Sequence, residues 1–221
     1  QDGVTQKNIQ GIIQDHKGLM WFATWDGLYK FDGYTFKNYK AHPGDSIGLS
    51  NNRLDNIKED KYGYIWVGTE YGLSKFDGYR FTNYLHNEED TTSITDYIIS
   101  DLLVDKKGNL WIGCAKGLMR YNYETNNFSR LQFPDGRKPR IYSMVESHNG
   151  DILLGTAGYG LYSVKDRNTR KGTDNLFTIR QERQYAERDS DVFFTHIYGL
   201  CRDIFRIVRK ACKDCRHIPN R

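Results

Sequence analysis

The stretch Trp21–Tyr39, WFATWDGLYKFDGYTFKNY, returns as WVGTEYGLSKFDGYRFTNY at Trp66–Tyr84 with the same spacing of aromatic residues, glycines and the final Asp-Gly pair. Four glycines mark successive units at intervals of 45, 45 and 42 residues: Gly18, Gly63, Gly108 and Gly150. A repeat of about 40–45 residues is typical of four-stranded propeller blades and of some arrays of helical pairs. The content of each unit therefore decides between these two folds.

Every unit opens with two apolar segments around a short turn. In the first unit these segments are Ile9–Ile13 and Leu19–Thr24, and the turn is Asp15-x-x-Gly18. The four units read DHKGLMWFAT, DKYGYIWVGT, DKKGNLWIGC and SHNGDILLGT, so the fourth lacks both the Asp and the Trp. Glycine at the fourth turn position suits a short hairpin loop in which one residue has positive φ. The two segments are therefore predicted to be neighbouring antiparallel strands.

A second hairpin follows in each of the first two units. Asp32-Gly33 stands between two runs of alternating side chains, which is the sequence form of a two-residue type I′ hairpin. The predicted cross-strand pairs are Phe31–Tyr34, Tyr29–Phe36 and, in the second unit, Phe76–Tyr79. Each such pair contributes roughly 0.2–1 kcal/mol to sheet stability.

Four short strands per unit, with no helical periodicity, predict an all-β fold. We expect a β-propeller built from four-stranded antiparallel blades, with about four complete blades plus a partial fifth. The predicted propeller covers residues 1–198, with blades at about 7–39, 50–84, 94–131 and 140–180 and the partial blade at 190–198. Such a set leaves two uncovered edges, so the chain is expected to be a fragment. Its expected partners are the remaining blades and domains of the same protein, or a second copy of the chain.

Composition and charge exclude several classes of protein. The 221 residues are 38% hydrophobic and 14% aromatic, which is typical of a globular chain. Residues 1–200 hold 25 Lys+Arg against 26 Asp+Glu, whereas residues 201–221 hold 7 against 2. Because the main body carries no excess positive charge, nucleic-acid binding there is not expected. No apolar run approaches the ~20 residues that a transmembrane helix needs.

The cysteines follow the same division. Cys114 stands where the other units carry threonine, and is predicted to be a small buried strand residue. The other three lie in an atypical basic tail at 199–221, whose apolar spacing permits an amphipathic helix. Cys212-x-x-Cys215 with His217 is a weak zinc pattern. The abrupt change of composition favours instead a non-native tail produced by a reading-frame change.

The predicted topology sorts the loops into two ends. Tight turns join the first strand to the second and the third to the fourth, while the varying loops gather at the opposite end. An exposed aromatic ring there can stack on a sugar while a neighbouring carboxylate accepts hydroxyl hydrogen bonds. The predicted ligand-binding residues are Trp25, Asp26, Glu70, Tyr71, Lys116, Tyr159 and Arg140. The alternative is that the rings only cover the rim of the blades. Most other charged residues of this end are expected to be solvated, namely His42, Asp45, His86, Glu88 and Arg137.

Two repeated positions have structural interpretations. The turn aspartates Asp15, Asp60 and Asp105 are predicted to form turns, because a calcium loop needs several oxygen ligands and DHKG, DKYG and DKKG each offer one carboxylate. The repeated tryptophans Trp21, Trp66 and Trp111 are predicted to lie in the core between blades.

Three segments resemble two-component regulator propeller repeats, namely MWFATWDGLYKFDG, IWVGTEYGLSKFDG and LWIGCAKGLMRYN, and the resemblance covers roughly residues 2–164. The resemblance implies the N-terminal, extracytoplasmic sensor region of a hybrid two-component histidine kinase/response regulator, located in the periplasm and responding to a carbohydrate breakdown product. The phosphorelay domains that it implies are absent from this chain, and no export signal precedes the first repeat in the chain as given.

No catalytic pattern stands out in the sequence. The six histidines are scattered, and no nucleophile elbow, phosphate loop or zincin motif is found. The chain is therefore expected to be no enzyme and to hold no cofactor or metal. A protein-interaction scaffold and a propeller lyase are the alternatives, because some propellers are enzymes. A histidine and a carboxylate converging at the loop-rich end would indicate the lyase.

Overall fold

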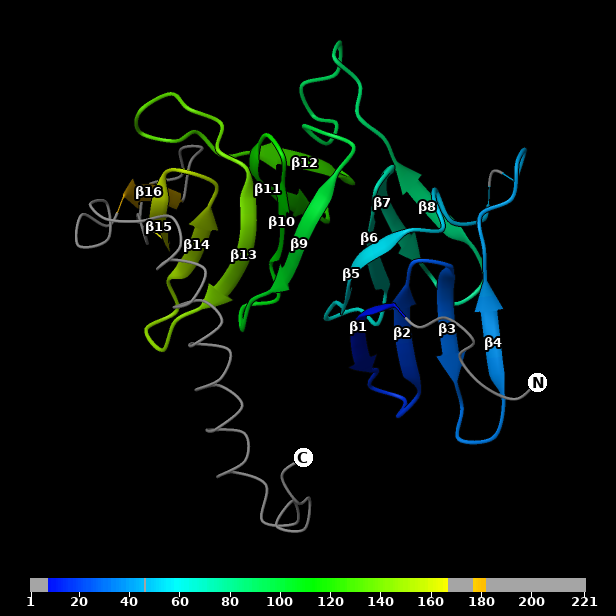
Figure 1. Ribbon diagram of the computed structural model, residues 1–221. Coiled ribbons are helices and arrows are strands. Elements are labelled where there is room, and N and C mark those ends of the chain that lie inside the picture. The colour runs from blue at the N-terminus through cyan, green and yellow to red at the C-terminus, as the bar shows by residue number, and fades with distance from the viewer. Residues whose placement is uncertain (1–7, 46, 167–176, 182–221) are drawn as a thin grey trace. The chain divides into compact units, whose positions relative to one another are not determined.

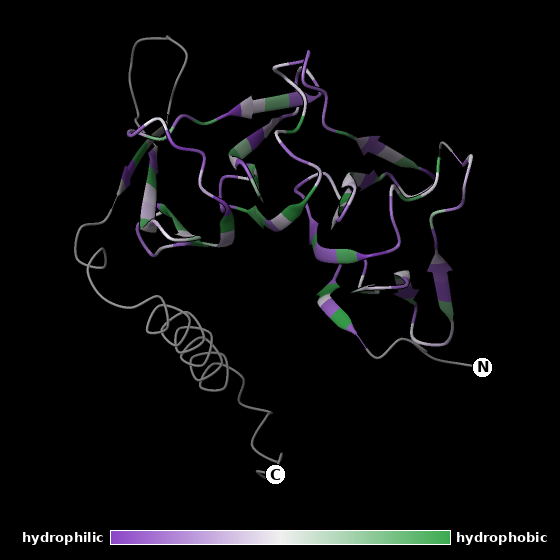
Figure 2. Cartoon of the chain, turned by 45° about the horizontal axis from the view of Figure 1, so that its top comes forward, coloured by the Kyte–Doolittle hydropathy of each residue, from purple (hydrophilic) through white to green (hydrophobic). Residues whose placement is uncertain are grey.

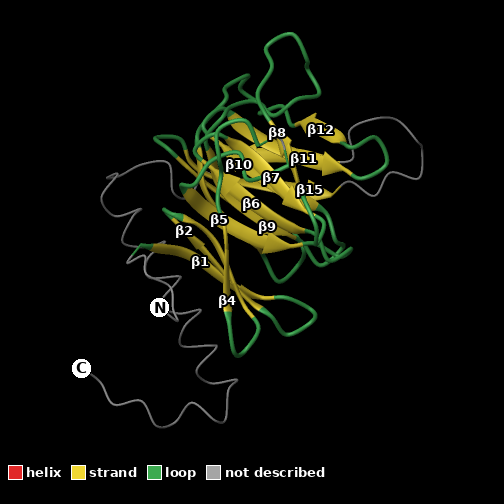
Figure 3. Ribbon diagram, turned by 90° about the vertical axis from the view of Figure 1, so that its right-hand side faces the viewer, coloured by secondary structure: helices red, strands yellow, loops and turns green. Residues whose placement is uncertain are grey.

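The computed structural model describes residues 8–45, 47–166 and 177–181. These residues lie within the first of two compact units, Gln1–Glu182, and form four separate four-stranded sheets. Strands and loops make up the described part, which contains no helix (Figure 3). The second unit, Arg183–Arg221, lies outside the described residues, and so do the predicted fifth blade and the tail.

The sixteen strands of the described residues follow the chain in sets of four (Figure 1). Blade 1 contains β1 (Ile9–Gln14), β2 (Met20–Thr24), β3 (Gly27–Phe31) and β4 (Phe36–Tyr39). Blade 2 contains β5 (Leu54–Glu59), β6 (Ile65–Thr69), β7 (Gly72–Phe76) and β8 (Phe81–Tyr84). Blade 3 contains β9 (Ile99–Val104), β10 (Leu110–Cys114), β11 (Gly117–Asn122) and β12 (Asn127–Arg130). Blade 4 contains β13 (Ile141–Glu146), β14 (Ile152–Thr156), β15 (Gly160–Asp166) and β16 (Phe177–Gln181).

Each blade is an antiparallel sheet whose strands pair in chain order, with no crossover. The first strands, β1, β5, β9 and β13, lie beside one another in that order. The predicted all-β architecture of four-stranded antiparallel blades is confirmed. In Figure 2 hydrophobic and hydrophilic segments alternate along the strands, as expected when each sheet packs against a neighbouring sheet.

The turn between the first two strands of a blade is tied to the core. In blade 1 the Asp15 Oδ1 atom accepts the backbone N–H groups of Lys17 (3.0 Å) and Leu19 (2.9 Å). The Asp15 Oδ2 atom accepts the indole N–H of Trp21 at 2.8 Å. Gly18 has φ of 84° and closes the turn by donating its N–H to the Asp15 carbonyl. The predicted turn role of the aspartate is confirmed.

Blades 2 and 3 repeat this arrangement. Trp66 donates to Asp60 at 2.7 Å and Trp111 donates to Asp105 at 2.8 Å. All three tryptophans are buried in clusters between blades, as predicted.

Small residues on the second strands allow the blades to approach closely. A Cβ atom at Gly68 would lie 2.8 Å from the Cγ2 atom of Ile99 in the next blade. A Cβ atom at Gly113 would lie equally close, 2.8 Å, to the Cγ2 atom of Ile141. Real carbon atoms do not come so close, so glycine at these positions sets the spacing of blades 2, 3 and 4.

The predicted two-residue hairpin is wrong. Phe31 pairs with Phe36, and Phe76 pairs with Phe81, so four residues form each loop. The reason lies in the turn carboxylate: Asp32 Oδ1 accepts the N–H groups of both Tyr34 (2.8 Å) and Thr35 (2.7 Å). These two bonds keep Tyr34 and Thr35 in the loop, and they lower the pKa of Asp32. The predicted pairs Phe31–Tyr34, Tyr29–Phe36 and Phe76–Tyr79 therefore do not form.

Cys114 is fully buried in β10, as predicted. Its Sγ atom lies 3.3 Å from the Gly117 carbonyl oxygen, which it can donate to. Thr24 and Thr69 donate to the equivalent glycine carbonyls at 2.8 and 2.9 Å. The thiol thus replaces a threonine hydroxyl in the turn that joins the second and third strands.

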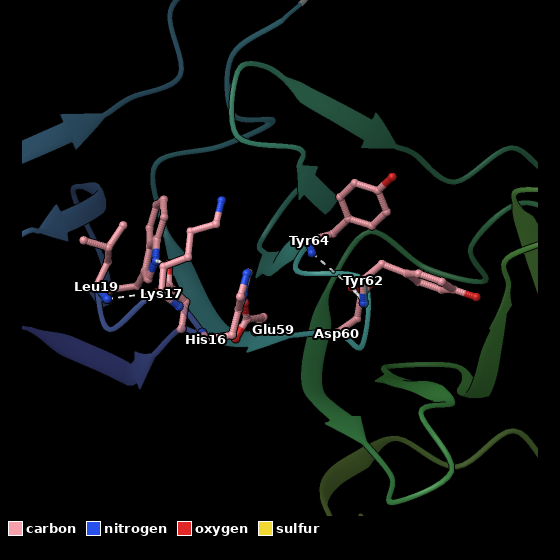
Figure 4. A network of polar contacts seen from close by, with 9 residues as sticks. His16, Lys17, Leu19, Glu59, Asp60, Tyr62 and Tyr64 are labelled. Carbon is pink, nitrogen blue, oxygen red and sulfur yellow. Dashed lines mark hydrogen bonds and ion pairs between the residues drawn. The ribbon is translucent and has the colours of Figure 1, made fainter.

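Polar contacts join neighbouring blades at the end that carries the tight turns (Figure 4). The backbone N–H of His16 in blade 1 donates to Glu59 Oε2 in blade 2 at 2.9 Å, and the His16 ring meets Glu59 Oε1. Between blades 3 and 4 the N–H of Lys106 donates to Glu146 Oε2 at 3.0 Å. The same kind of contact therefore joins blade 1 to blade 2 and blade 3 to blade 4.

Candidate ligand-binding site at the loop-rich end

The loop-rich end of blades 1 and 2 carries a cluster built around Arg53. Trp25 lies in the loop between β2 and β3, and its side chain is 40% exposed. The Arg53 guanidinium, just before β5, lies 4.8 Å from the centre of the Trp25 ring. Arg53 Nη2 also pairs with Glu70 Oε1 at 3.2 Å, so it bridges the varying loops of two blades. An exposed pair of this kind adds little stability.

Asp55 extends this cluster toward blade 4. Burial raises the pKa of Asp55, and the charge of Glu70 raises it further. The charges of Arg53 and Arg140 and a hydrogen bond from the Trp25 side chain lower it again. A carboxylate of blade 2 is thus influenced by an arginine that immediately precedes β13 of blade 4. The Arg140 guanidinium itself lies 5.2 Å from the centre of the Tyr142 ring.

The structure brings two of the predicted site residues, Trp25 and Glu70, into one cluster, and a third, Arg140, acts on this cluster through its charge. It does so through Arg53 and Asp55, which the sequence analysis missed. Arg53 lies where an inter-blade loop enters the first strand, and the residue at this position differs between units (Asn8, Arg53, Ile98 and Arg140). That variation was the available signal.

The other predicted residues lie in separate contacts. Asp26 pairs with Lys40 at 2.7 Å, and Lys116 pairs with Asp96 at 3.3 Å. Tyr159 lies beneath the Arg137 guanidinium at 4.8 Å.

Tyr71 stacks on Tyr97 with ring centres 4.9 Å apart and an angle of 6° between the planes. His86 lies edge-on to Tyr97, and its Nδ1 atom meets the Ile94 carbonyl oxygen at 2.7 Å. The stacked pair makes a second aromatic surface, carried by the loops of blades 2 and 3. His42, Asp45 and Glu88 are exposed, as expected for solvated side chains.

Within the described residues, no group of three or more histidine, cysteine, aspartate or glutamate side chains could hold a metal ion. A histidine and a carboxylate do meet at His16 and Glu59, but they lie among the tight turns, away from the varying loops. No helix in the described part of the chain has the length and apolarity needed to cross a membrane.

Three segments match the family model of the two component regulator propeller: residues 3–26, 48–71 and 93–116. Each segment covers the first hairpin of a blade and the loop that follows it. A histidine kinase, P4, of Formosa agariphila is 49% identical over 49 residues, which is 22% of this chain and 4% of the kinase.

Solved structures agree with this family match. A domain from B. thetaiotaomicron, described as the extracellular domain of a hybrid two-component system, matches with a TM-score of 0.67 and 25% identity. The match covers 74% of this chain and 24% of that domain. PorZ, a surface component of the type-IX secretion system of Porphyromonas gingivalis, matches with a TM-score of 0.60 and 20% identity, over 81% of this chain and 28% of PorZ.

A virginiamycin B lyase from Staphylococcus aureus matches with a TM-score of 0.59 at 13% identity, over 84% of this chain and 60% of the lyase. At these identities PorZ and the lyase share only the fold. The fold is thus that of a β-propeller. The chain carries three repeats that match the two component regulator propeller, and it spans about a quarter of the extracellular domain that it matches.

Proposed function

We propose that this chain is the ligand-sensing propeller of an extracytoplasmic sensor in a two-component signalling protein. Its ligand is a carbohydrate breakdown product, and the phosphorelay domains belong to the rest of the protein. The likeness to an extracellular domain of a hybrid two-component system supports the location and the signalling role. In this proposal the propeller performs no catalysis.

One observation carries the choice of ligand. The cluster of Trp25, Arg53, Asp55 and Glu70 joins an exposed aromatic ring to carboxylates and a guanidinium on the varying loops. Ring faces, carboxylate acceptors and guanidinium donors are the groups that hold a sugar, which has an apolar face and hydroxyl edges. The repeated strands beneath supply a rigid support.

The exposure of blade 1 supports a larger assembly. Ile12 and Ile57 occupy equivalent positions on β1 and β5, yet Ile12 is 54% exposed and Ile57 is 2% exposed. Ile57 is covered by blade 1, and the equivalent face of blade 1 has no such cover among the described residues. We infer that a further blade of the same protein, or a second copy, packs against this face.

A thermal-shift screen of the chain against neutral and acidic oligosaccharides tests the function. One sugar class should raise the melting temperature in a concentration-dependent way, following RT ln(1 + [L]/Kd). The substitution Trp25→Ala should weaken that stabilisation. Glu124→Gln, an exposed change in the turn between β11 and β12, should leave it unchanged.

Two outcomes would contradict the proposal. Turnover of a bound compound, detected by chromatography of the incubated sugars, would indicate a lyase instead. No stabilisation by any oligosaccharide would leave the ligand assignment without support and would favour a protein-binding scaffold, since the family resemblance alone does not name a ligand.

A further inference from the structure

The four innermost strands share a β-bulge at the same place, directly after each strand begins. The pairing skips one residue between Ile9 and Gly11, and it does the same in β5, β9 and β13. The extra residues are Gln10, Asp55, Ser100 and Tyr142. A bulge re-aims a side chain and interrupts the ladder, and bulges are frequent beside binding sites.

These four positions differ, although the residue before each of them is constant in character. Ile9, Leu54, Ile99 and Ile141 are all aliphatic. At the bulges stand an amide, a carboxylate, a hydroxyl and a phenol. The first strands of the four blades therefore carry different polar groups at equivalent positions.

Three of the bulges lie on neighbouring strands. Asp55 belongs to β5, and Arg140 precedes β13 and stacks on the bulge residue Tyr142. Strand β9 lies between β5 and β13 and makes contact with both. Asp55, Ser100 and Tyr142 are therefore the bulge residues of three adjacent strands, and Arg140 packs on the last of them. In agreement, the Arg140 charge lowers the pKa of Asp55.

Ser100 is the bulge residue of that intervening strand. Its Oγ atom is buried and has no hydrogen-bond partner among the described residues. A buried hydroxyl without a partner costs about 1–3 kcal/mol, so it is rarely retained without a reason. The residue as a whole is partly exposed, and rotation about its Cα–Cβ bond can turn the hydroxyl toward a ligand.

We propose that the bulges of β5, β9 and β13 form the subsite for one neutral sugar residue, with Asp55 accepting a hydroxyl hydrogen bond and Ser100 and Arg140 donating to its neighbouring oxygens. The inference rests on the proposed function and names the class of sugar. Arg53 and Arg140 are balanced in charge by Glu70 and Asp55. A ligand with its own carboxylate would leave one negative charge unbalanced beside two acids, whereas a neutral sugar leaves the balance intact.

The subsite predicts a direction for the pH dependence of binding. A sugar hydroxyl that donates to Asp55 requires the ionised carboxylate, so affinity should fall as pH is lowered through the pKa of Asp55. The groups that act on this carboxylate are Glu70, Arg53, Arg140 and the Trp25 side chain. Replacing Asp55 by asparagine should remove the acid-side loss of affinity.

The test is calorimetric titration of the full chain with cellobiose, laminaribiose and mannobiose, and with digalacturonate as the acidic comparison. We expect one neutral disaccharide to bind, and Asp55→Asn and Ser100→Ala each to weaken it by 10-fold or more. Glu124→Gln at the opposite end should bind as the unchanged chain does. Ser100→Ala removes an unpartnered hydroxyl and should not lower the melting temperature, so it remains informative if Asp55→Asn fails to fold.

The outcomes separate this inference from the proposed function. Binding of a neutral sugar that both variants retain would overturn the subsite and leave the sensor function standing. Binding of digalacturonate alone would overturn the neutral class. Binding of none of these sugars would overturn the subsite, and the proposed function would fall with it only if the wider oligosaccharide screen were also negative.

Discussion

The indole nitrogen of Trp21 donates a 2.8 Å hydrogen bond to the Oδ2 atom of Asp15, and both side chains are buried. The bond joins a surface turn to the core between two blades. In blade 4 both partners are replaced, by Ser147 and Leu153. The Ser147 hydroxyl instead donates to the Asp151 carbonyl at 2.7 Å. Blade 4 thus lacks both partners of the bond, and either polar group alone would be left without its partner.

The Asp15–Trp21 bond should show strong coupling in a double-mutant cycle. Asp15→Asn places an amide N–H₂ or a reoriented oxygen against the indole and breaks one of the bonds, so we expect a loss of about 1–3 kcal/mol in the free energy of unfolding. Trp21→Phe should leave the carboxylate without its donor and cost a similar amount. In the Trp21→Phe background, Asp15→Asn should cost clearly less. Additive losses in urea unfolding would contradict the coupling.

Because the hairpin loop has four residues, substitutions of two aromatic residues of blade 2 should differ greatly in their effect on stability. Tyr79 is 96% exposed at the tip of the loop, so Tyr79→Ser should change the free energy of unfolding by less than about 0.5 kcal/mol. Phe81 is buried and packs on Phe76 with ring centres 4.7 Å apart. Phe81→Ala should cost about 3–5 kcal/mol. A large loss for Tyr79→Ser would restore the two-residue register that the sequence favoured.

The architecture was predictable because the repeats carry it. The tryptophans of the first three units and the turn glycines of all four predicted the blades and the buried faces. The hairpin register was not predictable from Asp32-Gly33, since the deciding bonds come from the Asp32 side chain to Tyr34 and Thr35. Side-chain capping of a turn leaves the same sequence signature as a two-residue turn.

The candidate site was predictable only in part. Trp25, Glu70 and Arg140 could be named as candidates because they vary between units and lie on loops. Asp55 was missed, because a β-bulge shifts one strand residue out of the alternating pattern without any mark in the sequence. The bridging role of Arg53 could not be predicted, because it depends on the distance between blades 1 and 2, which a sequence repeat does not give.

Asp101 makes stability depend on pH in the mildly acidic range. Its carboxylate accepts hydrogen bonds from Asn56 Nδ2 and from the N–H of Met144, each at 2.6 Å, and so joins three blades. Burial nevertheless raises the pKa of Asp101 to about 6 from 3.8. Because the carboxyl group holds its proton more tightly in the folded chain, it contributes its full stabilisation at pH values below its pKa in the unfolded chain. This contribution is lost as pH rises through about 6.

Asp101→Asn should therefore flatten the pH profile. The difference in unfolding free energy between the variant and the unchanged chain should shift in favour of the variant by on the order of 3 kcal/mol between pH 4 and pH 7. Urea unfolding at several pH values measures this difference. A difference that is constant with pH would show that Asp101 titrates at its ordinary value. Glu124→Gln, an exposed change in the turn between β11 and β12, provides a control for the loss of one carboxyl group.

Asn126 should be more sensitive to loss of its side-chain oxygen than to its backbone conformation. It has φ of 55°, a region that glycine adopts more easily. Its Oδ1 atom accepts hydrogen bonds from the phenol groups of Tyr84, at 2.6 Å, and Tyr121, and so links blades 2 and 3. Burial raises the pKa of Tyr84, which keeps this phenol protonated and able to donate.

Two substitutions of Asn126 separate these effects. Asn126→Gly relieves the backbone but leaves two phenol groups without their acceptor, so it should lower the free energy of unfolding by about 1–2 kcal/mol. Asn126→Asp keeps the acceptor and places a negative charge near Lys75, whose Nζ atom lies 3.4 Å from Oδ1. It should remain within about 1 kcal/mol of the unchanged chain, since an exposed ion pair adds little. If Asn126→Gly proved the more stable of the two, backbone strain would outweigh the link between the blades.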